Sequence, residues 1–254
     1  MGKNNWTREE HILAFNLYCK VPFTKINSSN KAIQQLAPII GRSVGAVAMK
    51  LANFARLDPA LQKRNISGLA QGAKGEEEVW NEFNGNWEEL SWQSERILAR
   101  YKGESIEKSS RIDVDNMPTE GKERATVVKT RVNQSFFRKT ILASYNYACC
   151  ITGISIPELL IASHIIPWSI DRNNRVNPSN GLCLNSLHDS AFDKGVITIT
   201  PDYKVKLSKA IIENKDDYTA NFFLPYQDKF INLPGRFLPE KEFLNWHNTN
   251  VFMK

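Results

Sequence analysis

The segment 159–196 constrains the fold more than any other part of this 254-residue chain. It opens with an apolar run over 159–166, which has the length and composition of a buried strand. A polar loop follows, and Asn180-Gly181 leads into a second short apolar run over 182–184. Residues 187–193 then show the pattern of a short amphipathic helix, with a glycine placed to end it. We therefore expect a strand, a loop, a second strand and a helix.

This segment resembles the HNH nucleases, whose catalytic module is the ββα-metal fold, and most of all the HNH branch of restriction-type endonucleases. The likeness rests on three blocks that occur in order: Ser163-His164-Ile165-Ile166-Pro167-Trp168, Asn180-Gly181-Leu182-Cys183-Leu184, and His188-Asp189-Ser190-Ala191-Phe192-Asp193-Lys194-Gly195. Taken singly, each histidine is more often a hydrogen-bonded core residue than a catalytic one. Three linked blocks on the expected elements are far more specific.

The resemblance implies hydrolysis of phosphodiester bonds with a single divalent metal. It makes His164 the general base, Asn180 the residue that braces the loop, and His188 a metal ligand. Ser163 stands where an Asp or His ligand often precedes the base, so the metal is expected to keep more waters or to recruit Asp189 or Asp193. An oxygen-rich site favours Mg²⁺ or Mn²⁺, while one imidazole ligand leaves Zn²⁺ or Ni²⁺ open.

Residues 5–57 read as an all-helical unit. Thr7 and Glu10 are spaced as a capping box, Asn30 or Ser29 is placed to begin a second helix, and Ser43 a third. The tight turn before the third helix suggests a helix-turn-helix, and the Trp6-Thr7-Arg8-Glu9-Glu10 opening resembles Myb or SANT-like helical triplets. The polar positions expected against DNA are Arg42, Ser43, Lys50, Asn53 and Arg56, with a solvated surface as the alternative, while the apolar positions are assigned to the core.

The rest of the chain divides by composition. Residues 58–101 contain an aromatic cluster around Trp80 and Trp87 that we assign to the core rather than to base stacking, because the segment is acidic. Residues 102–124 are poor in apolar side chains and are expected to be a linker, which leaves 1–101 as a helical DNA-recognition domain (1–57 helix-turn-helix-like, 58–101 a helical bridge) and 125–254 as the nuclease domain. The predicted fold class is therefore α+β.

Two further sets of residues are candidates for DNA contact. The first, Arg131, Gln134 and Arg138, lies on a predicted helix ahead of the HNH segment, in an Arg-Val-Asn-Gln stretch that the resemblance includes; internal salt bridges are the alternative. The second, Lys204 and Lys206, lies on a predicted hairpin over 196–207, where an ordinary solvated strand is the alternative.

The charge of the chain is distributed unevenly. The net charge is +6, with 8 basic and 3 acidic side chains in residues 1–60, 9 and 13 in 61–123, and 16 and 11 in 124–254. Two basic ends around an acidic middle are compatible with binding a polyanion, although such charges also occur in proteins that touch no nucleic acid. The four cysteines have no C-x-x-C spacing and are expected to be reduced and buried.

No apolar run is long enough to span a bilayer, and the N-terminus lacks the apolar core of a signal peptide, so a cytoplasmic location without membrane contact is expected. His11 and His247 are expected at the surface. Together these features predict a metal-dependent double-stranded DNA endonuclease of restriction or modification-dependent type. Cutting both strands favours a homodimer, whereas a nickase could be monomeric. The alternatives are a DNA-binding regulator with a decayed nuclease module, and a non-specific nuclease or RNase.

Overall fold

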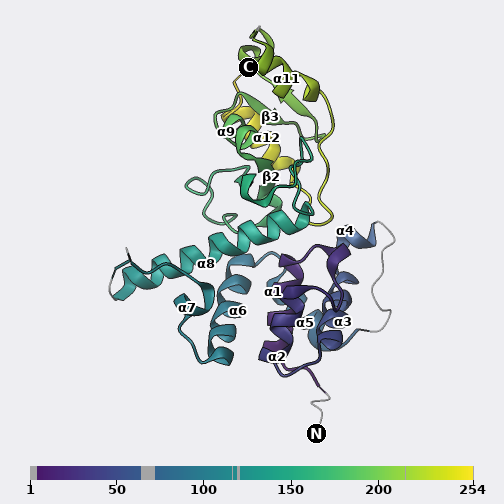
Figure 1. The fold of residues 1–254 in the computed structure, drawn as a ribbon, viewed down its shortest axis with the longest axis vertical. Helices are drawn as coiled ribbons and strands as arrows, with labels where there is room; N and C mark the ends of the chain where they lie inside the picture. The colour runs from purple at the N-terminus through teal and green to yellow at the C-terminus, as the bar shows by residue number, and fades with distance from the viewer. Residues whose placement is uncertain (1–4, 64–71, 116, 119–120, 215, 254) are drawn as a thin grey trace. The chain divides into compact units, whose positions relative to one another are not determined.

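The computed structural model describes residues 5–63, 72–115, 117–118, 121–214 and 216–253. The chain forms two compact units, Met1–Thr140 and Ile141–Lys254. The first is helical and the second combines helices with two small antiparallel sheets, so the fold class is α+β as predicted (Figure 1). No helix in the described ranges is both long and apolar enough to cross a membrane.

Unit 1 is built from seven helices and most of an eighth within its described residues. They are α1 (Arg8–Lys20), α2 (Lys31–Ile39), α3 (Val44–Ala55), α4 (Pro59–Gln62), α5 (Lys74–Phe83), α6 (Trp87–Lys102), α7 (Ile106–Ser110) and α8 (Gly121–Ser144), with a short 3-10 helix, η1 (Phe23–Lys25).

The predicted helix starts in this unit are confirmed. Thr7 and Glu10 form the reciprocal capping box of α1, Asn30 accepts the backbone N–H groups at the start of α2, and Ser43 caps α3. Between α2 and α3 the chain turns at Gly41, whose φ of +66° is a conformation that glycine adopts at little cost. Short polar side chains thus determine where the first three α-helices of this unit begin.

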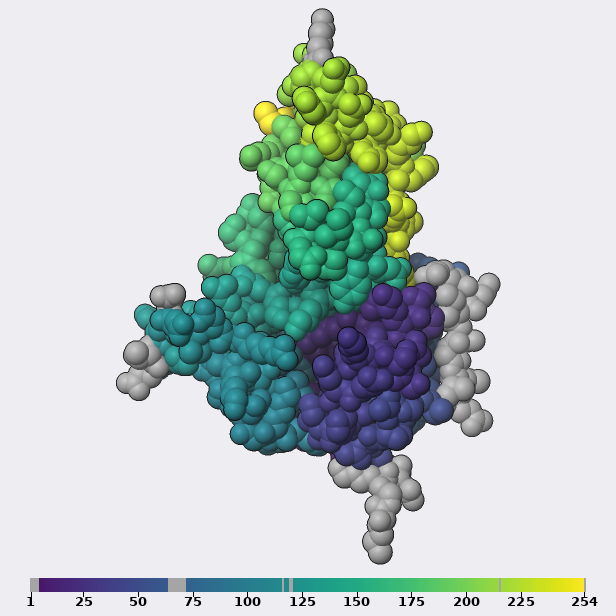
Figure 2. All heavy atoms as spheres, viewed as in Figure 1, coloured from purple at the N-terminus to yellow at the C-terminus, as the bar shows by residue number. Residues whose placement is uncertain are grey.

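The core of unit 1 forms where α1 packs against α3, α5 and α6. The ring of Phe15 lies 5.0 Å from the rings of Phe54 and of Trp80, and Trp87 is buried beside them. On the face shown in Figure 2, residues of α1 and of α6 lie side by side. The aromatic cluster is therefore core, as its acidic surroundings predicted.

The predicted linker 102–124 is not a stretch of extended chain in its described residues. It contains α7, which Ser105 caps, and the first residues of α8. The structure divides between Thr140 and Ile141 instead, inside α8. A low content of apolar residues could not reveal this, because short capped helices need few buried side chains.

Unit 2 contains the predicted ββα arrangement. Strand β1 (Leu160–His164) pairs antiparallel with β2 (Gly181–Asn185), with His164 opposite Gly181 and Ser163 opposite Leu182. Helix α9 (Ser186–Asp193) follows β2 directly and packs against both strands. It ends before Gly195, where a side chain would collide with the backbone of Val251.

The remaining elements of unit 2 complete its core around α9. Strand β3 (Ile197–Ile199) pairs with β4 (Val205–Leu207), confirming the predicted hairpin, and α12 (Lys241–Asn250) packs on β3 (Figure 1). Between them lie α10 (Lys209–Ile212), α11 (Asp217–Phe222) and the 3-10 helix η4 (Leu224–Tyr226), and two more 3-10 turns, η2 (Pro157–Leu159) and η3 (Pro178–Asn180), precede the strands of the first hairpin. All four cysteines are free and buried, as expected.

Two histidines predicted at the surface are buried, and that prediction was wrong. His11 has an exposed fraction of 3% and His247 of 2%. The His247 ring stacks on Phe192 with 3.7 Å between ring centroids, and it hydrogen-bonds Thr198 Oγ1 and the backbone oxygen of Phe192. Both hydrogen-bond partners of His247 lie about fifty residues away along the chain, so no local sequence pattern could have predicted that it is buried.

The burial of His247 predicts a loss of stability in acid. Burial lowers the pKa of His247 to about 4, so the unfolded chain binds a proton first as the pH falls. Keeping His247 neutral therefore costs the folded protein nothing above about pH 6.5. As the pH falls from there to about 4, the free energy of unfolding decreases by about 3 kcal/mol, because the unfolded chain takes up a proton that the folded chain does not. We expect the free energy of unfolding of unit 2, measured in urea at pH 7 and 4.5, to fall less in His247→Gln than in the wild type. Equal losses in the two proteins would contradict this account.

Candidate active site

His164 is the last residue of β1, and its imidazole has two contacts that hold it in place. Nε2 lies 2.9 Å from the backbone oxygen of Arg175, and the ring meets Trp168 edge-on at 5.7 Å. A carbonyl oxygen only accepts hydrogen bonds, so Nε2 carries the proton and the lone pair lies on Nδ1. Burial lowers the pKa of His164, against the opposing effect of the Arg175 carbonyl. The residue is therefore neutral at neutral pH, the form that a general base requires.

Asn180 is fully buried and holds together the loop that supports His164. Its Oδ1 accepts from the backbone N–H of Ile166 at 2.8 Å, and its Nδ2 donates to the backbone oxygens of Ile166 and Asn174. Asn174 immediately precedes Arg175, whose carbonyl accepts from His164. The asparagine thus fixes the backbone on both sides of the loop, as an amide with two donors and an acceptor can.

Ser163 and Asp189 lie close together where α9 packs on β1. Burial raises the pKa of the Asp189 carboxyl and the Ser163 hydroxyl opposes that rise, although no hydrogen bond of standard geometry joins Ser163 Oγ to a described group. One helical turn on, burial and the charge of Asp189 raise the pKa of Asp193. The half-buried carboxyl of Asp189 thus lies near a buried hydroxyl that has no hydrogen-bond partner of standard geometry among the described residues, and Asp193 is exposed one turn further on.

His188 faces different surroundings from its neighbour Asp189, because consecutive helix residues point about 100° apart. Its Nδ1 lies 3.1 Å from Asn185 Oδ1, the oxygen that also caps α9. The rings of Phe223 and Tyr226 lie 5.2 and 5.5 Å from the imidazole, which is 2% exposed. Burial lowers the pKa of His188, and the backbone of Phe222 opposes this shift. The predicted metal ligand thus has the environment of a core histidine, although its Nε2 has no hydrogen-bond partner among the described residues.

The donor groups fit a hydrated, oxygen-preferring cation better than a closed nitrogen or sulfur site. In the described ranges, no three His, Cys, Asp or Glu side chains converge so as to hold an ion. Asp189, with the neighbouring Ser163 hydroxyl and Asp193, offers oxygen atoms only, the donors that Mg²⁺ and Mn²⁺ prefer while they keep several waters. A tetrahedral Zn²⁺ site would need more imidazole or thiolate ligands than this cluster contains.

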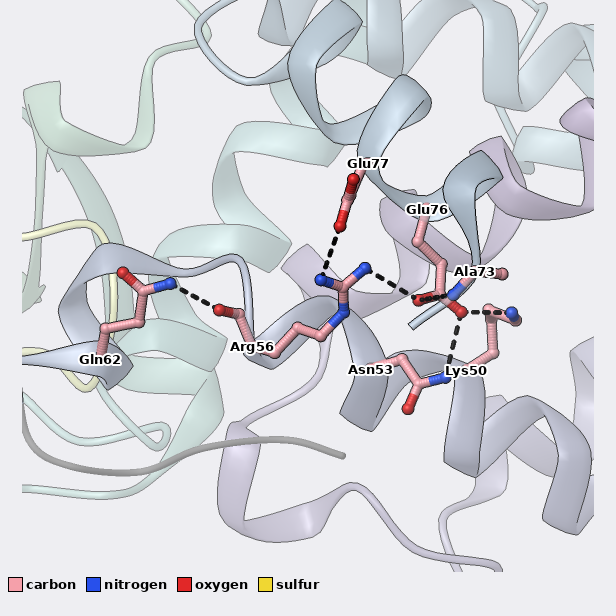
Figure 3. Close-up of polar contacts among 7 residues, drawn as sticks. All are labelled: Lys50, Asn53, Arg56, Gln62, Ala73, Glu76 and Glu77. Carbon is pink, nitrogen blue, oxygen red and sulfur yellow. Dashed lines mark hydrogen bonds and ion pairs between the residues drawn. The ribbon is translucent and has the colours of Figure 1, made fainter. Parts of the chain in front are cut away.

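The basic residues predicted to meet DNA from the helix-turn-helix are engaged inside unit 1, which corrects that assignment. The Arg42 guanidinium pairs with buried Glu10 at 2.8 Å. Lys50 and Arg56 pair with buried Glu76, and Asn53 donates to the same carboxylate at 3.0 Å (Figure 3). The exposed fractions of the Arg42, Lys50 and Arg56 side chains are 7, 8 and 16%. Their charges are compensated by glutamates of other helices, and Ser43 is occupied as a cap.

The predicted contacts on α8 are placed differently. Arg131, Gln134 and Arg138 are all exposed and follow one face of the helix at a spacing of three and four residues. Neither arginine forms an ion pair with a described residue. Among these residues, the alternative of internal salt bridges for Arg131 and Arg138 is therefore not observed. Of the hairpin residues, Lys206 is exposed, while Lys204 is half-buried, pairs with Asp202 at 3.6 Å and lies over the ring of Phe230.

Sequence reasoning missed the residues that hold the loop after β1. The Arg175 guanidinium lies over the Trp168 ring at 5.3 Å and its Nε donates to the backbone oxygen of Trp168, which closes the loop beside His164. Asp171 binds the backbone N–H groups of Asn173 and Asn174 in an Asx turn. The many Asp and Asn residues in the loop could have indicated these turns. No sequence pattern indicates that the backbone carbonyl of Arg175 accepts a hydrogen bond from His164.

Comparison with known proteins agrees with this geometry. A family model described as an HNH endonuclease matches residues 149–200, which include β1, the loop, β2 and α9. No curated protein was found to match the chain. The matched segment covers the general-base candidate, the bracing asparagine and the oxygen cluster. Residues 149–200 are therefore an HNH endonuclease domain, of the kind that acts on nucleic acid phosphodiester bonds with a divalent metal.

Proposed function

We propose that the protein is a metal-dependent DNA endonuclease with His164 as general base, serving in restriction or modification-dependent defence. The observation that carries the proposal is the Nε2–H hydrogen bond of His164 to the Arg175 carbonyl inside an HNH domain, because it leaves the basic lone pair on Nδ1. The restriction role follows from the resemblance of the three sequence blocks to restriction-type enzymes.

The residues divide the work of hydrolysis between them. His164 Nδ1 takes the proton of the attacking water, while Nε2 stays bonded to the Arg175 carbonyl and holds the ring still. Asn180 keeps that carbonyl in place through the backbone of Asn174. A divalent cation held by Asp189 and Ser163 would supply Lewis-acid stabilisation of the negative charge that develops during hydrolysis.

Asp189 and Ser163 are the residues that we propose to hold the cation, with Asp193 one turn away. Their oxygens lie together beside the strand that ends in His164. His188 is the weaker candidate, because its ring is enclosed by Asn185, Phe223 and Tyr226. Because the donors of this cluster are all oxygen atoms, Mg²⁺ or Mn²⁺ is the cation that we expect to support cleavage.

DNA is proposed to lie along the exposed face of α8, where Arg131 and Arg138 provide uncompensated positive charge. Replacing both by Ala should lower the slope of log Kd against log salt by about 2, since each lost phosphate contact removes about one released counterion. The measurement is the anisotropy of a labelled duplex in EDTA at several salt concentrations. Lys129→Ala on the same helix is the control, because Lys129 already pairs with Glu88 at 2.7 Å and should change the slope less. An unchanged slope in the double variant would remove α8 from the interface.

A second candidate is a DNA-binding regulator whose nuclease module has decayed. Ser163 favours it, because a hydroxyl is a poorer ligand than the Asp or His that the family often has there. Supercoiled plasmid incubated with Mg²⁺ or Mn²⁺ separates the two: nicked or linear product supports the nuclease, and intact plasmid at every metal concentration supports the regulator. A smear, or degradation of RNA in parallel, would indicate a non-specific nuclease instead.

The restriction assignment is tested with matched phage DNA, one sample unmodified and the other carrying methylated or hydroxymethylated cytosine. Discrete fragments from only one sample, with sequenced ends that share a motif, are the expected result. Equal cleavage of both samples at unrelated positions would contradict it. Sedimentation with and without duplex then shows whether two copies assemble to cut both strands.

A further inference from the structure

Unit 1 contains a cavity whose lining includes none of the residues proposed to carry out cleavage. It has a volume of about 480 Å³ and lies between the N-terminal half of α8 and the chain that follows α7. Arg111 and Arg131 line it, and neither forms an ion pair with a described residue. Arg111 ends α7 in the left-handed conformation, with a φ of +54°, which a non-glycine side chain adopts at some cost.

The charged side chains that line the cavity are mostly basic. Two of the side chains that line it, Arg111 and Arg131, are basic, and both are exposed. Within the described residues the acidic group that lines the cavity is Asp113, whose Oδ1 accepts from the backbone N–H of Asp115 and is thereby held in a turn. Two arginines against one carboxylate in the same lining favour an anionic occupant.

The rest of the lining is suited to more than an inorganic anion. Ile112, Met117 and Val127 provide apolar surface, and Ser135 provides a hydroxyl. Small-molecule sites typically combine an apolar wall with a few polar groups and enclose about 300–1,000 Å³, so this cavity has room for a ring system as well as a phosphate. Guanidinium groups recognise phosphate oxygens with two parallel hydrogen bonds.

We propose that this cavity binds one nucleoside monophosphate, with Arg111 and Arg131 on the phosphate and the apolar wall against the base or sugar. The nucleotide is either free or part of a DNA strand; the chemistry recognised is the same. The inference shares Arg131 with the DNA-binding face proposed for α8, but it concerns a separate site in the helical unit that requires neither His164 nor a metal.

Binding is tested on the full chain in EDTA, so that cleavage plays no part. Each of the four deoxynucleoside monophosphates is titrated by NMR and calorimetry, with inorganic phosphate and the deoxynucleosides alongside. At least one nucleotide should bind in a saturable manner, more tightly than either phosphate or its nucleoside alone, with shifts confined to residues near Arg111 and Val127. Absence of saturable nucleotide binding, or phosphate binding as tight as the nucleotide, would overturn the proposal.

Variants then locate the site. Arg111→Ala should weaken nucleotide binding about tenfold or more, as expected for loss of a charge-assisted phosphate contact. Arg96→Ala is the matched control, since Arg96 is an exposed arginine of α6 that does not line the cavity. Val127→Phe, which fills the cavity without a change in charge, should also abolish binding. Competition by a single-stranded oligonucleotide indicates a strand nucleotide, and its failure to compete indicates a free one. If both Arg111→Ala and Val127→Phe bind like the wild type, the cavity is not the site.

Discussion

His164→Ala is expected to cleave supercoiled DNA about 10²–10⁴ times more slowly than the wild type while it keeps the wild-type fold. The reason is local: the variant removes the nitrogen that takes the proton from water, but Asn180 still bonds Ile166 and Asn174 and keeps the loop closed. Cleavage rates are measured at a saturating Mg²⁺ or Mn²⁺ concentration. Circular dichroism and duplex affinity in EDTA should remain those of the wild type.

The control for this experiment is chemical rescue. Removing the side chain leaves space beside Trp168 and the Arg175 carbonyl, where added imidazole has the same hydrogen-bond acceptor available. Imidazole in the buffer should therefore restore part of the rate in His164→Ala and leave His247→Gln, which alters a buried histidine of α12, unaffected. A His164→Ala protein that cleaves as fast as the wild type would show that another group acts as the base.

The sequence predicted the ββα module well because its signals are local. Strand length, the Asn180-Gly181 turn and the terminating Gly195 each depend on residues a few positions apart, and the helix caps at Thr7, Asn30 and Ser43 have the same property. Such signals do not depend on what packs against them. Elements of this kind could therefore be placed to within a few residues.

What the sequence could not supply were the partners of buried polar groups. Arg42 and Glu10 are thirty-two residues apart in the sequence, and Lys50 and Glu76 are twenty-six apart. The basic residues were therefore predicted to be free to bind DNA, although glutamates compensate their charges in the folded chain. The same limit applies on α9. Whether His188 or Asp189 faces β1 depends on the rotation of the helix, which Asn185 and the rings of Phe223 and Tyr226 help to set.

Glu76→Ala is expected to destabilise unit 1 by about 3–5 kcal/mol, the largest effect of a single substitution that we predict outside the HNH domain. The Glu76 side chain is completely buried and is bonded by Lys50, by Asn53 at 3.0 Å and by the backbone N–H of Ala73 at 3.2 Å (Figure 3). Burial alone would raise the pKa of Glu76, but the bonds from Lys50 and Asn53 lower it overall, so the carboxylate is charged in the folded protein. The variant leaves the Lys50 ammonium buried without its counter-ion.

Glu77→Ala is the matched control, because Glu77 is the next residue on α5, pairs with Arg56 at 2.8 Å and is half exposed. An exposed pair of this kind contributes about 0–1 kcal/mol, so the two neighbouring substitutions should differ several-fold in urea unfolding. Glu76→Leu combined with Lys50→Met should recover much of the loss, since it removes both buried charges together and leaves Arg56 paired with Glu77. If the double variant is no more stable than Glu76→Ala, the cost comes from packing and not from the stranded charge. If instead the double variant recovers the lost stability, the role of Lys50 is to bind α3 to α5. The DNA contacts of the helical unit are then expected on α8.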